Sequence, residues 1–145
     1  MIKKLPFIFS VAVILFTGST VAQTPSLKEA FRKDFLIGTA INARQIEGKD
    51  IVADKLIKEQ FNAVTPENCM KAEEIHPGWD TYNFDLADKL VAFAKTNHLK
   101  VNAHNLIWHS QLPAFMHHIQ SADSVRQYFV NHITKVAGRY DGNVY

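Results

Sequence analysis

The stretch Phe61-Asn62-Ala63-Val64-Thr65-Pro66-Glu67-Asn68-Cys69-Met70-Lys71 decides the fold. Its first part, around residues 63–65, has the length and apolar character of a short buried strand, and Pro66 stops it because proline cannot continue a ladder. Polar side chains follow at once, including Glu67 and Lys71. A buried strand that ends directly in a polar cluster is typical of a parallel sheet with a functional site at its carboxyl edge.

Working outward, two further strand-length apolar runs flank this stretch, at residues 35–41 and 99–107. The run 35–41 is continuously apolar, which predicts a strand covered on both faces. Residues 143–145 resemble the opening of a fourth strand. The intervals carry apolar residues at helical spacing. These residues are Ile51, Val52, Leu56 and Phe61; then Leu86, Leu90, Phe93 and Ala94; then Val125, Phe129, Ile133, Val136 and Tyr140.

Boundary signals support these helices. Ser26 and Glu29 have the spacing of a capping box, so a short helix should open the fold. Asn83 is expected to cap the second long helix, and Gly138 to stop the third. We expect loops at residues 67–82 and 108–120.

Strand and helix therefore alternate three times before a fourth strand starts, which predicts an α/β fold of parallel strands with helical crossovers. Two architectures fit, a (β/α) barrel and an open doubly wound sheet. The first strand–helix turn lacks the closely spaced glycines of a dinucleotide or phosphate site. This disfavours the nucleotide-binding form of the open sheet.

Residues 1–22 have the layout of a signal peptide: Lys3 and Lys4, an apolar run from Leu5 to Phe16, and small residues up to Ala22. We expect export to the periplasm or the outside of the cell, with no membrane anchor after cleavage, because the run is shorter than the about 20 residues of a spanning helix. The whole chain has 16 basic and 14 acidic residues; removal of two lysines leaves 14 of each. A neutral chain gives no sign of nucleic-acid binding.

The polar residues that follow the second and third strands are the candidate site. Carboxyl ends of adjacent parallel strands face one pocket, so the two groups should meet. Their mixture of carboxylate, amides, ammonium and imidazole suits sugar hydroxyls, which both donate and accept, and an indole suits the apolar face of a sugar ring. The candidates for substrate binding are Glu67, Asn68, Lys71, His104, Trp108 and Gln111.

Other interpretations of these residues remain open from chemistry alone. Glu67 and Lys71 are four apart and could be a surface ion pair, while Trp108 could fill the core. His104 and His109 could suggest a metal site, but no third ligand stands at a fitting spacing, so we predict neither metal nor cofactor. The single cysteine, Cys69, is expected to be a small buried filler.

Together the two clusters resemble the second-strand and third-strand signatures of family 10 glycoside hydrolases. The first signature runs over residues 61–71 and the second over 104–113, from His104 to Pro113. Between them, residues 75–77, 82–84 and 87–88 also fit the family pattern, and so do residues 38–40. The similarity extends from about residue 27 to residue 145, which makes residues 23–145 part of a family 10 catalytic domain.

This resemblance implies an endo-1,4-β-xylanase on an eight-stranded barrel, cleaving with retention, of which the chain supplies three β/α units and the start of strand four. Glu67, Asn68 and Lys71 match family positions that hold xylose on the non-reducing side of the cut. His104, Trp108 and Gln111 match positions nearer the scissile bond. The family's acid/base and nucleophile glutamates would follow Tyr145, so no catalytic residue is predicted here, and the chain alone is expected to be inactive.

Within the chain, Glu73, Glu74 and Asp85 stand in a loop and at a helix start, which argues against a catalytic role for them. Two departures from the family are visible, Ala72 where many members have Trp and residues 102–103 where Arg-Gly is common. The expected partners are xylan or xylo-oligosaccharides and, as a candidate, the remaining half of the barrel. The rival hypotheses are a non-catalytic xylan-binding protein and a barrel hydrolase for another β-1,4-glycan.

Overall fold

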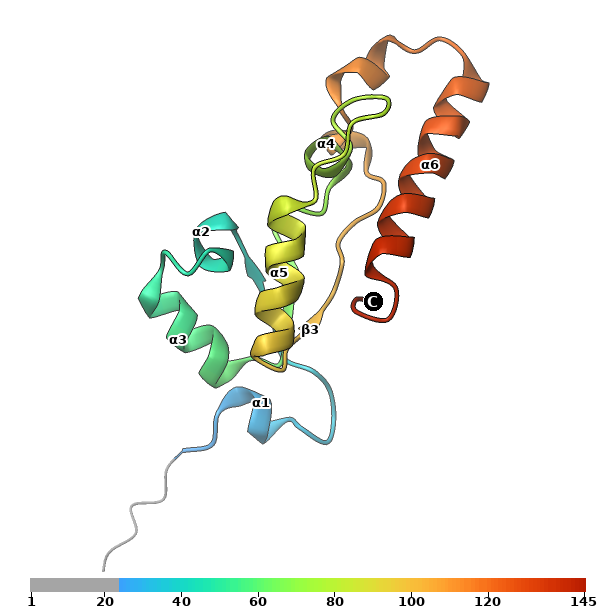
Figure 1. The fold of residues 1–145 in the computed structure, drawn as a ribbon. Helices are drawn as coiled ribbons and strands as arrows, with labels where there is room; N and C mark the ends of the chain where they lie inside the picture. Colours follow the sequence, from blue (N-terminus) through green and yellow to red (C-terminus); the bar gives the residue numbers. More distant parts are fainter. Residues whose placement is uncertain (1–23) are drawn as a thin grey trace, which may run out of the picture.

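The computed structural model describes residues 24–145, and its strands form one parallel sheet (Figure 1). The strands are β1 (Gly38–Ile41), β2 (Ala63–Pro66) and β3 (Lys100–Val101), hydrogen-bonded in the order β1-β2-β3. The signal peptide predicted at residues 1–22 lies outside the described residues. No helix among residues 24–145 is long and apolar enough to cross a membrane.

Strand order follows chain order, and the fourth position of the sheet is also occupied. Thr39 pairs with Val64, and Val64 with Val101. Beyond β3, the backbone N–H of Tyr145 donates to the Val101 carbonyl at 3.0 Å, and the Ala103 N–H donates to the Tyr145 carbonyl at 2.9 Å. These two bonds repeat the parallel pattern, as predicted for the start of a fourth strand. An order that does not reverse is that of a barrel, whereas doubly wound sheets reverse it.

Three long helices connect the strands: α3 (Ile51–Gln60), α5 (Asp85–Thr96) and α6 (Ala122–Tyr140). Asp50 caps α3 by accepting from the Ala53 N–H at 3.0 Å, and Ser121 caps α6 by accepting from the Ser124 N–H. The prediction that Asn83 caps the second long helix is wrong by one residue: the N-cap of α5 is Phe84, which makes no side-chain capping bond. Asn83 lies just before it, and its Oδ1 accepts from the Asp85 N–H at 3.2 Å.

Five short elements complete the fold: α1 (Leu27–Ala30), α2 (Ala43–Ile46), α4 (Ala72–Ile75), η1 (His109–Gln111) and η2 (Ala114–His118). The predicted helix after Ser26 is present as α1, where the Ser26 N–H donates to the Glu29 carboxylate at 3.2 Å. The capping box expected from the spacing of Ser26 and Glu29 is therefore present at the start of α1.

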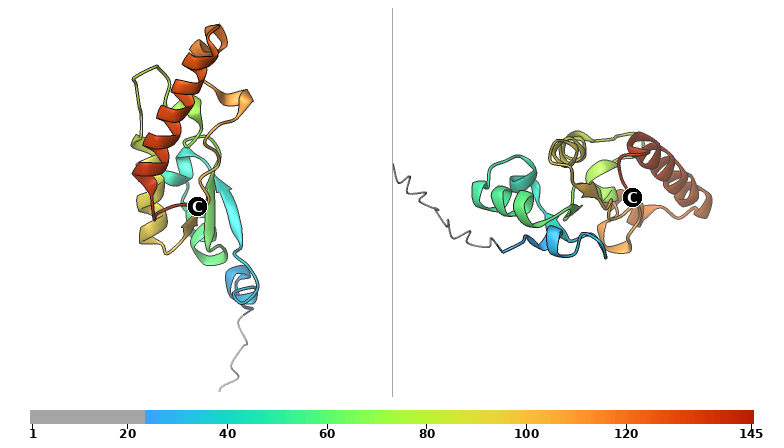
Figure 2. Two further views of the ribbon diagram at one scale, coloured as in Figure 1. Left: turned by 90° about the vertical axis from the view of Figure 1, so that its right-hand side faces the viewer. Right: turned by 90° about the horizontal axis from the view of Figure 1, so that it is seen from below.

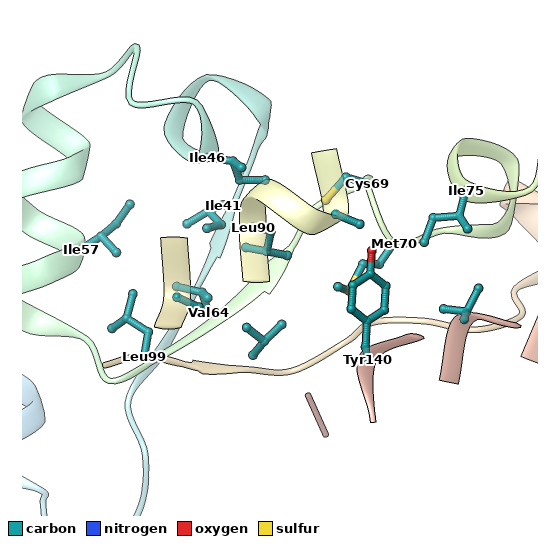
Figure 3. Close-up of a cluster of buried hydrophobic side chains, with 14 residues drawn as sticks. Ile41, Ile46, Ile57, Val64, Cys69, Met70, Ile75, Leu90, Leu99 and Tyr140 are labelled. Atoms are coloured by element: carbon teal, nitrogen blue, oxygen red, sulfur yellow. The ribbon is translucent and has the colours of Figure 1, made fainter. Parts of the chain in front are cut away.

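The core lies between the sheet and the long helices (Figure 3). Ile41 and Val64 of the strands and Leu90 of α5 are fully buried, and Ile57 of α3 is nearly so. Cys69 joins this cluster, and its burial raises the pKa of the thiol to about 11. A neutral, buried thiol is a packing element, as the sequence predicted.

The first strand is shorter than predicted, and one of its faces is open. β1 occupies only the second half of residues 35–41, and Phe35 and Leu36 before it are exposed. Within the strand, Gly38 and Ala40 are exposed while Ile41 is buried. In Figure 2, left, α5 and α6 stand on one side of the strands. The prediction of a strand covered on both faces is therefore wrong for these residues, because helices pack on one face only.

On two of the long helices, the residues that are buried differ from the apolar stripes predicted from the sequence. On α3, Ile51 and Val52 are 82% and 81% exposed, and Leu56 is also exposed, whereas Ile57 meets the sheet. On α6 the buried side chains stand four residues apart, and they differ from the predicted stripe except at the last two positions. They are Tyr128, His132, Val136 and Tyr140.

The remaining differences concern boundaries. Gly138 lies inside α6, and the turn after the helix is made at Gly142, whose φ of +72° suits glycine. The predicted third strand of residues 99–107 is reduced to β3. The loops predicted at 67–82 and 108–120 contain α4, η1 and η2.

Candidate active site

Both polar clusters lie at the carboxyl edge of the sheet, as predicted from the strand ends. Glu67 directly follows β2, and its backbone N–H donates to the Ile41 carbonyl at the end of β1, at 2.9 Å. The second cluster follows β3 and ends in η1. The two loops meet through side chains that are 43 residues apart in the sequence.

The centre of the site is the amide of Asn68. Its Oδ1 atom accepts from the Lys71 ammonium at 3.3 Å and from the Gln111 amide nitrogen at 3.2 Å. The same Gln111 nitrogen also donates to the Glu73 carboxylate at 2.6 Å. A continuous chain of hydrogen bonds therefore joins the loop after β2 to η1.

Trp108 covers the cation of this chain. The Lys71 ammonium lies 4.9 Å from the centre of the indole ring, within the range of a cation–π contact, and His109 meets the same indole edge-on. Trp108 is 38% exposed. The alternative of a tryptophan that fills the core is therefore wrong, and part of the aromatic surface is free to meet a ligand.

Lys71 is 8% exposed, although its partners lie at the rim of the site. None of the ion pairs within residues 24–145 joins it to Glu67. The alternative of an i,i+4 surface pair is therefore wrong: the ammonium is turned toward Asn68 and Trp108. A nearly buried cation keeps most of its strength as a donor, because little water competes for it.

The structure brings four of the six predicted residues into one connected group: Asn68, Lys71, Trp108 and Gln111. Glu67 and His104 are exposed at the same edge, and their side chains make no hydrogen bond to another described residue. The role of all six residues in substrate binding stays a prediction. Residues 24–145 hold no cluster of three side chains fit to bind a metal ion, so His104 and His109 gain no third ligand there.

Sequence reasoning missed Glu73. The sequence placed Glu73 in a loop and argued only against a catalytic role, but Glu73 lies in α4, whose N-cap residue is Lys71. Two glutamates in a first helical turn, after a residue of extended backbone, are a helix-start signal that could have placed it.

A stack of rings joins the C-cap residue of α4, His76, to α6. The imidazole of His76 lies between the rings of Tyr82 and Tyr128, with ring centres 3.9 Å and 4.2 Å apart. The Tyr128 hydroxyl donates to the His76 carbonyl at 2.9 Å, and His76 Nε2 lies 3.0 Å from the Trp79 carbonyl oxygen. His132, 5.5 Å from His76, is fully buried.

Burial controls the titration of these rings. It lowers the pKa of His132 to about 4, helped by the neighbouring His76, whose own pKa burial also lowers. The Leu106 carbonyl near His132 acts in the opposite direction, but neither ring nitrogen of His132 makes a well-formed hydrogen bond within residues 24–145. Burial raises the pKa of Tyr128. The rings of His76, His132 and Tyr128 are therefore neutral near pH 7.

Chemically, the site offers amide and ammonium donors, amide and carboxylate acceptors, and a partly exposed indole. This combination matches the hydroxyls and the apolar face of a sugar ring. The Glu73 carboxylate is engaged by the Gln111 amide.

Comparison with known proteins gives the same picture over nearly the whole described chain. The sequence profile of glycosyl hydrolase family 10 matches residues 26–145. Endo-1,4-beta-xylanase A of Xylanibacter ruminicola is 39% identical over 142 residues, covering 94% of this chain and 38% of that protein. The beta-1,4-xylanase of Dictyoglomus thermophilum is 40% identical over 123 residues, covering 85% of this chain and 34% of that protein.

Solved structures agree in fold. Xylanase 10B from Thermotoga petrophila RKU-1, determined in complex with xylobiose, superposes with a TM-score of 0.78 at 34% identity, over 84% of this chain and 38% of that one. The Thermobacillus composti GH10 xylanase superposes with a TM-score of 0.75 at 35% identity. The chain thus spans well under half of the proteins it matches, and its three β/α units and fourth-strand start are part of a (β/α)8 barrel. The chain belongs to glycosyl hydrolase family 10.

Proposed function

We propose that this chain is the glycone-binding part of an endo-1,4-β-xylanase, which hydrolyses internal β-1,4-xylosidic bonds with retention. The observation that carries the proposal is the chain of hydrogen bonds from Lys71 through Asn68 to Gln111, with Trp108 over the cation. Membership of family 10 and xylanase relatives support the substrate class. The xylobiose bound to the Thermotoga petrophila enzyme supports a xylo-oligosaccharide ligand.

Retention requires two carboxyl groups about 5–5.5 Å apart, one as acid/base and one as nucleophile. By the family resemblance, the acid/base would stand at the end of the fourth strand, beyond residue 145, and the nucleophile on a later strand. The role proposed for residues 24–145 is therefore binding: Glu67, Asn68 and Lys71 hold xylose on the non-reducing side, and His104, Trp108 and Gln111 hold it closer to the bond.

We further propose that residues 1–22 direct export and are removed, so that the protein acts on xylan in the periplasm or outside the cell. The basic, apolar and small-residue segments in that order are the support. Polymeric xylan is too large to enter a cell, which agrees with an exported enzyme.

The test uses a completed barrel, meaning this chain continued through the remaining β/α units by its own coding sequence or by grafting from a relative. Hydrolysis of xylan with release of retained-anomer products is expected. Glu67→Ala, Asn68→Ala and Lys71→Ala should each raise the barrier for cleavage by about 1–3 kcal/mol through lost hydrogen bonds to hydroxyls.

Glu59→Ala is the matched control, because Glu59 is an exposed carboxylate on α3, away from the carboxyl edge of the sheet. Its kinetics should equal those of the parent. Unchanged kinetics in the three site variants, together with lower melting temperatures, would make those residues structural. Binding of xylan without hydrolysis would favour the non-catalytic binding protein, and preference for cello-oligosaccharides would favour a hydrolase of another glycan.

A further inference from the structure

We propose that Glu73 is a positioning residue that fixes the side-chain amide of Gln111 and so determines which hydrogen-bonding groups the site presents to a sugar. The inference rests on the proposed function, since it concerns how the same site recognises its substrate. Glu73 lies in α4, and its carboxylate meets Gln111 across the gap between the two loops.

The first step is the orientation of Gln111. Its Nε2 atom donates to Glu73 Oε1 at 2.6 Å, a short distance that is typical of a charge-assisted bond. A carboxylate accepts but does not donate, so only the NH₂ end of the amide can face it. The carbonyl Oε1 of Gln111 is therefore turned away from Glu73, which makes it the acceptor that the residue offers to a ligand.

The second step is the orientation of Asn68. Its Oδ1 atom accepts from Lys71 and from Gln111, at 3.3 Å and 3.2 Å. An ammonium group can only donate, so the carbonyl end of Asn68 must face Lys71. Its NH₂ end remains as the free donor. The hydrogen bond from Gln111 to Asn68 couples the orientations of the two amides. Because Glu73 fixes Gln111, it also acts on the orientation of Asn68.

The site therefore presents one amide acceptor and one amide donor in fixed places beside Trp108. Terminal amide torsions are broad, and an unrestrained amide would sample both orientations. A side chain that is held before the ligand arrives loses less entropy on binding. Glu73 thus increases affinity without touching the sugar itself.

Local structure supports this role. Lys71 is the N-cap residue of α4, and the N–H groups of Glu74 and Ile75 donate to its carbonyl at 3.1 Å and 3.0 Å. Ile75 is fully buried and anchors the short helix. The short helix α4, anchored by its buried residues, therefore fixes both the donor, Lys71, and the acceptor, Glu73, that orient the two amides.

The experiment is a double-mutant cycle in the completed barrel, with xylotriose and longer xylo-oligosaccharides as substrates. Glu73→Ala should raise KM about tenfold, the size of one lost charge-assisted bond, with kcat within about twofold. Glu73→Gln should lose less, about threefold, because its carbonyl can still accept from Gln111. In a Gln111→Ala background, Glu73→Ala should change KM by less than about twofold, because its target is gone.

Glu74→Gln is the matched control, since it removes the same charge from the next residue of α4 without touching Gln111; it should behave as the parent does. Thermal unfolding of every variant separates positioning from folding, and Glu73→Gln, which keeps the side-chain volume, preserves the test if Glu73→Ala unfolds. Parental kinetics in both Glu73 variants, or an equal loss with and without Gln111, would overturn the inference while leaving the xylanase proposal intact. A parent that neither hydrolyses nor binds xylotriose would overturn the proposed function instead, and with it the premise of this inference.

Discussion

Replacement of His132 should remove a large part of the acid sensitivity of this fold. His132 is fully buried on α6 and stacks with His76, whose ring centre is 5.5 Å away. Its pKa of about 4 in the folded protein lies below the ordinary value of 6.5 that applies in the unfolded chain. Between these values the unfolded chain binds a proton that the folded chain does not.

The sign follows from this difference. The free energy of unfolding rises with pH wherever the unfolded state holds more protons, so stability is complete above about pH 7 and is lost as the pH falls through 6.5 toward 4. With these two pKa values, the loss attributable to His132 between pH 7 and pH 5 is about 2 kcal/mol.

The assay is urea denaturation of the completed barrel at pH 7, 6 and 5, followed by tryptophan fluorescence. His132→Phe keeps a flat ring for the stack, and His132→Leu covers the case in which the larger ring does not fit. Either variant should lose about 2 kcal/mol less than the parent between pH 7 and pH 5. His117→Phe, an exposed site on η2, is the control and should reproduce the pH dependence of the parent. Equal pH dependence in the parent and both His132 variants would refute the reasoning, since His132 would then exchange no proton on unfolding in this range.

Three further outcomes are expected. Leu90→Ala, at a fully buried position of α5 in the core, should lower the free energy of unfolding by about 3 kcal/mol in chemical denaturation. A loss below about 1 kcal/mol would mean that the neighbouring side chains collapse into the cavity. Residues 23–145 alone should release no reducing sugars from xylan, because the family's acid/base and nucleophile positions lie beyond Tyr145, and robust hydrolysis would contradict this. They should also not unfold in a sharp transition, because the open face and edge of β1 lack their covering, and a cooperative, soluble monomer would contradict that. Secreted protein should begin at Gln23, and an intact mass that still includes Met1 would contradict the signal peptide.

The parts of the fold that could be predicted from sequence depend on local chemistry. The strand after Phe61 needed only its apolar run and Pro66, and the meeting of Asn68 with Gln111 followed from the geometry of parallel strands. The helix that begins after Ser26 likewise depends on a contact between near neighbours, the bond from the Ser26 N–H to the Glu29 carboxylate. Each of these features is decided by residues close in sequence or by a rule that holds for all parallel sheets.

The predictions of the buried helix faces were wrong because the buried face depends on the surface against which each helix packs. Apolar spacing on α3 is satisfied by Ile51 and Val52 as well as by Ile57, and only the packing of the helix against the sheet selects Ile57. On α6 the buried face includes His132, a residue that a hydropathy pattern scores as polar. His132 is tolerated there because it is neutral and because its ring stacks with those of His76 and Tyr128. Both conditions depend on the tertiary structure.

Glu73 shows why the candidate site was incomplete. Its partner Gln111 is 38 residues away, and no periodic pattern links a glutamate in the first turn of a four-residue helix to an amide in η1. Under the proposed role of Glu73, this contact orients the amide of Gln111, which the sequence motifs alone do not indicate. Under the proposed function, the polarity of the glycone site is set inside the first three β/α units, while bond cleavage depends on carboxylates of later strands. Substitutions in the hydrogen-bonded chain of Lys71, Asn68, Gln111 and Glu73 should therefore act mainly on KM. Changes to the later carboxylates should act on kcat.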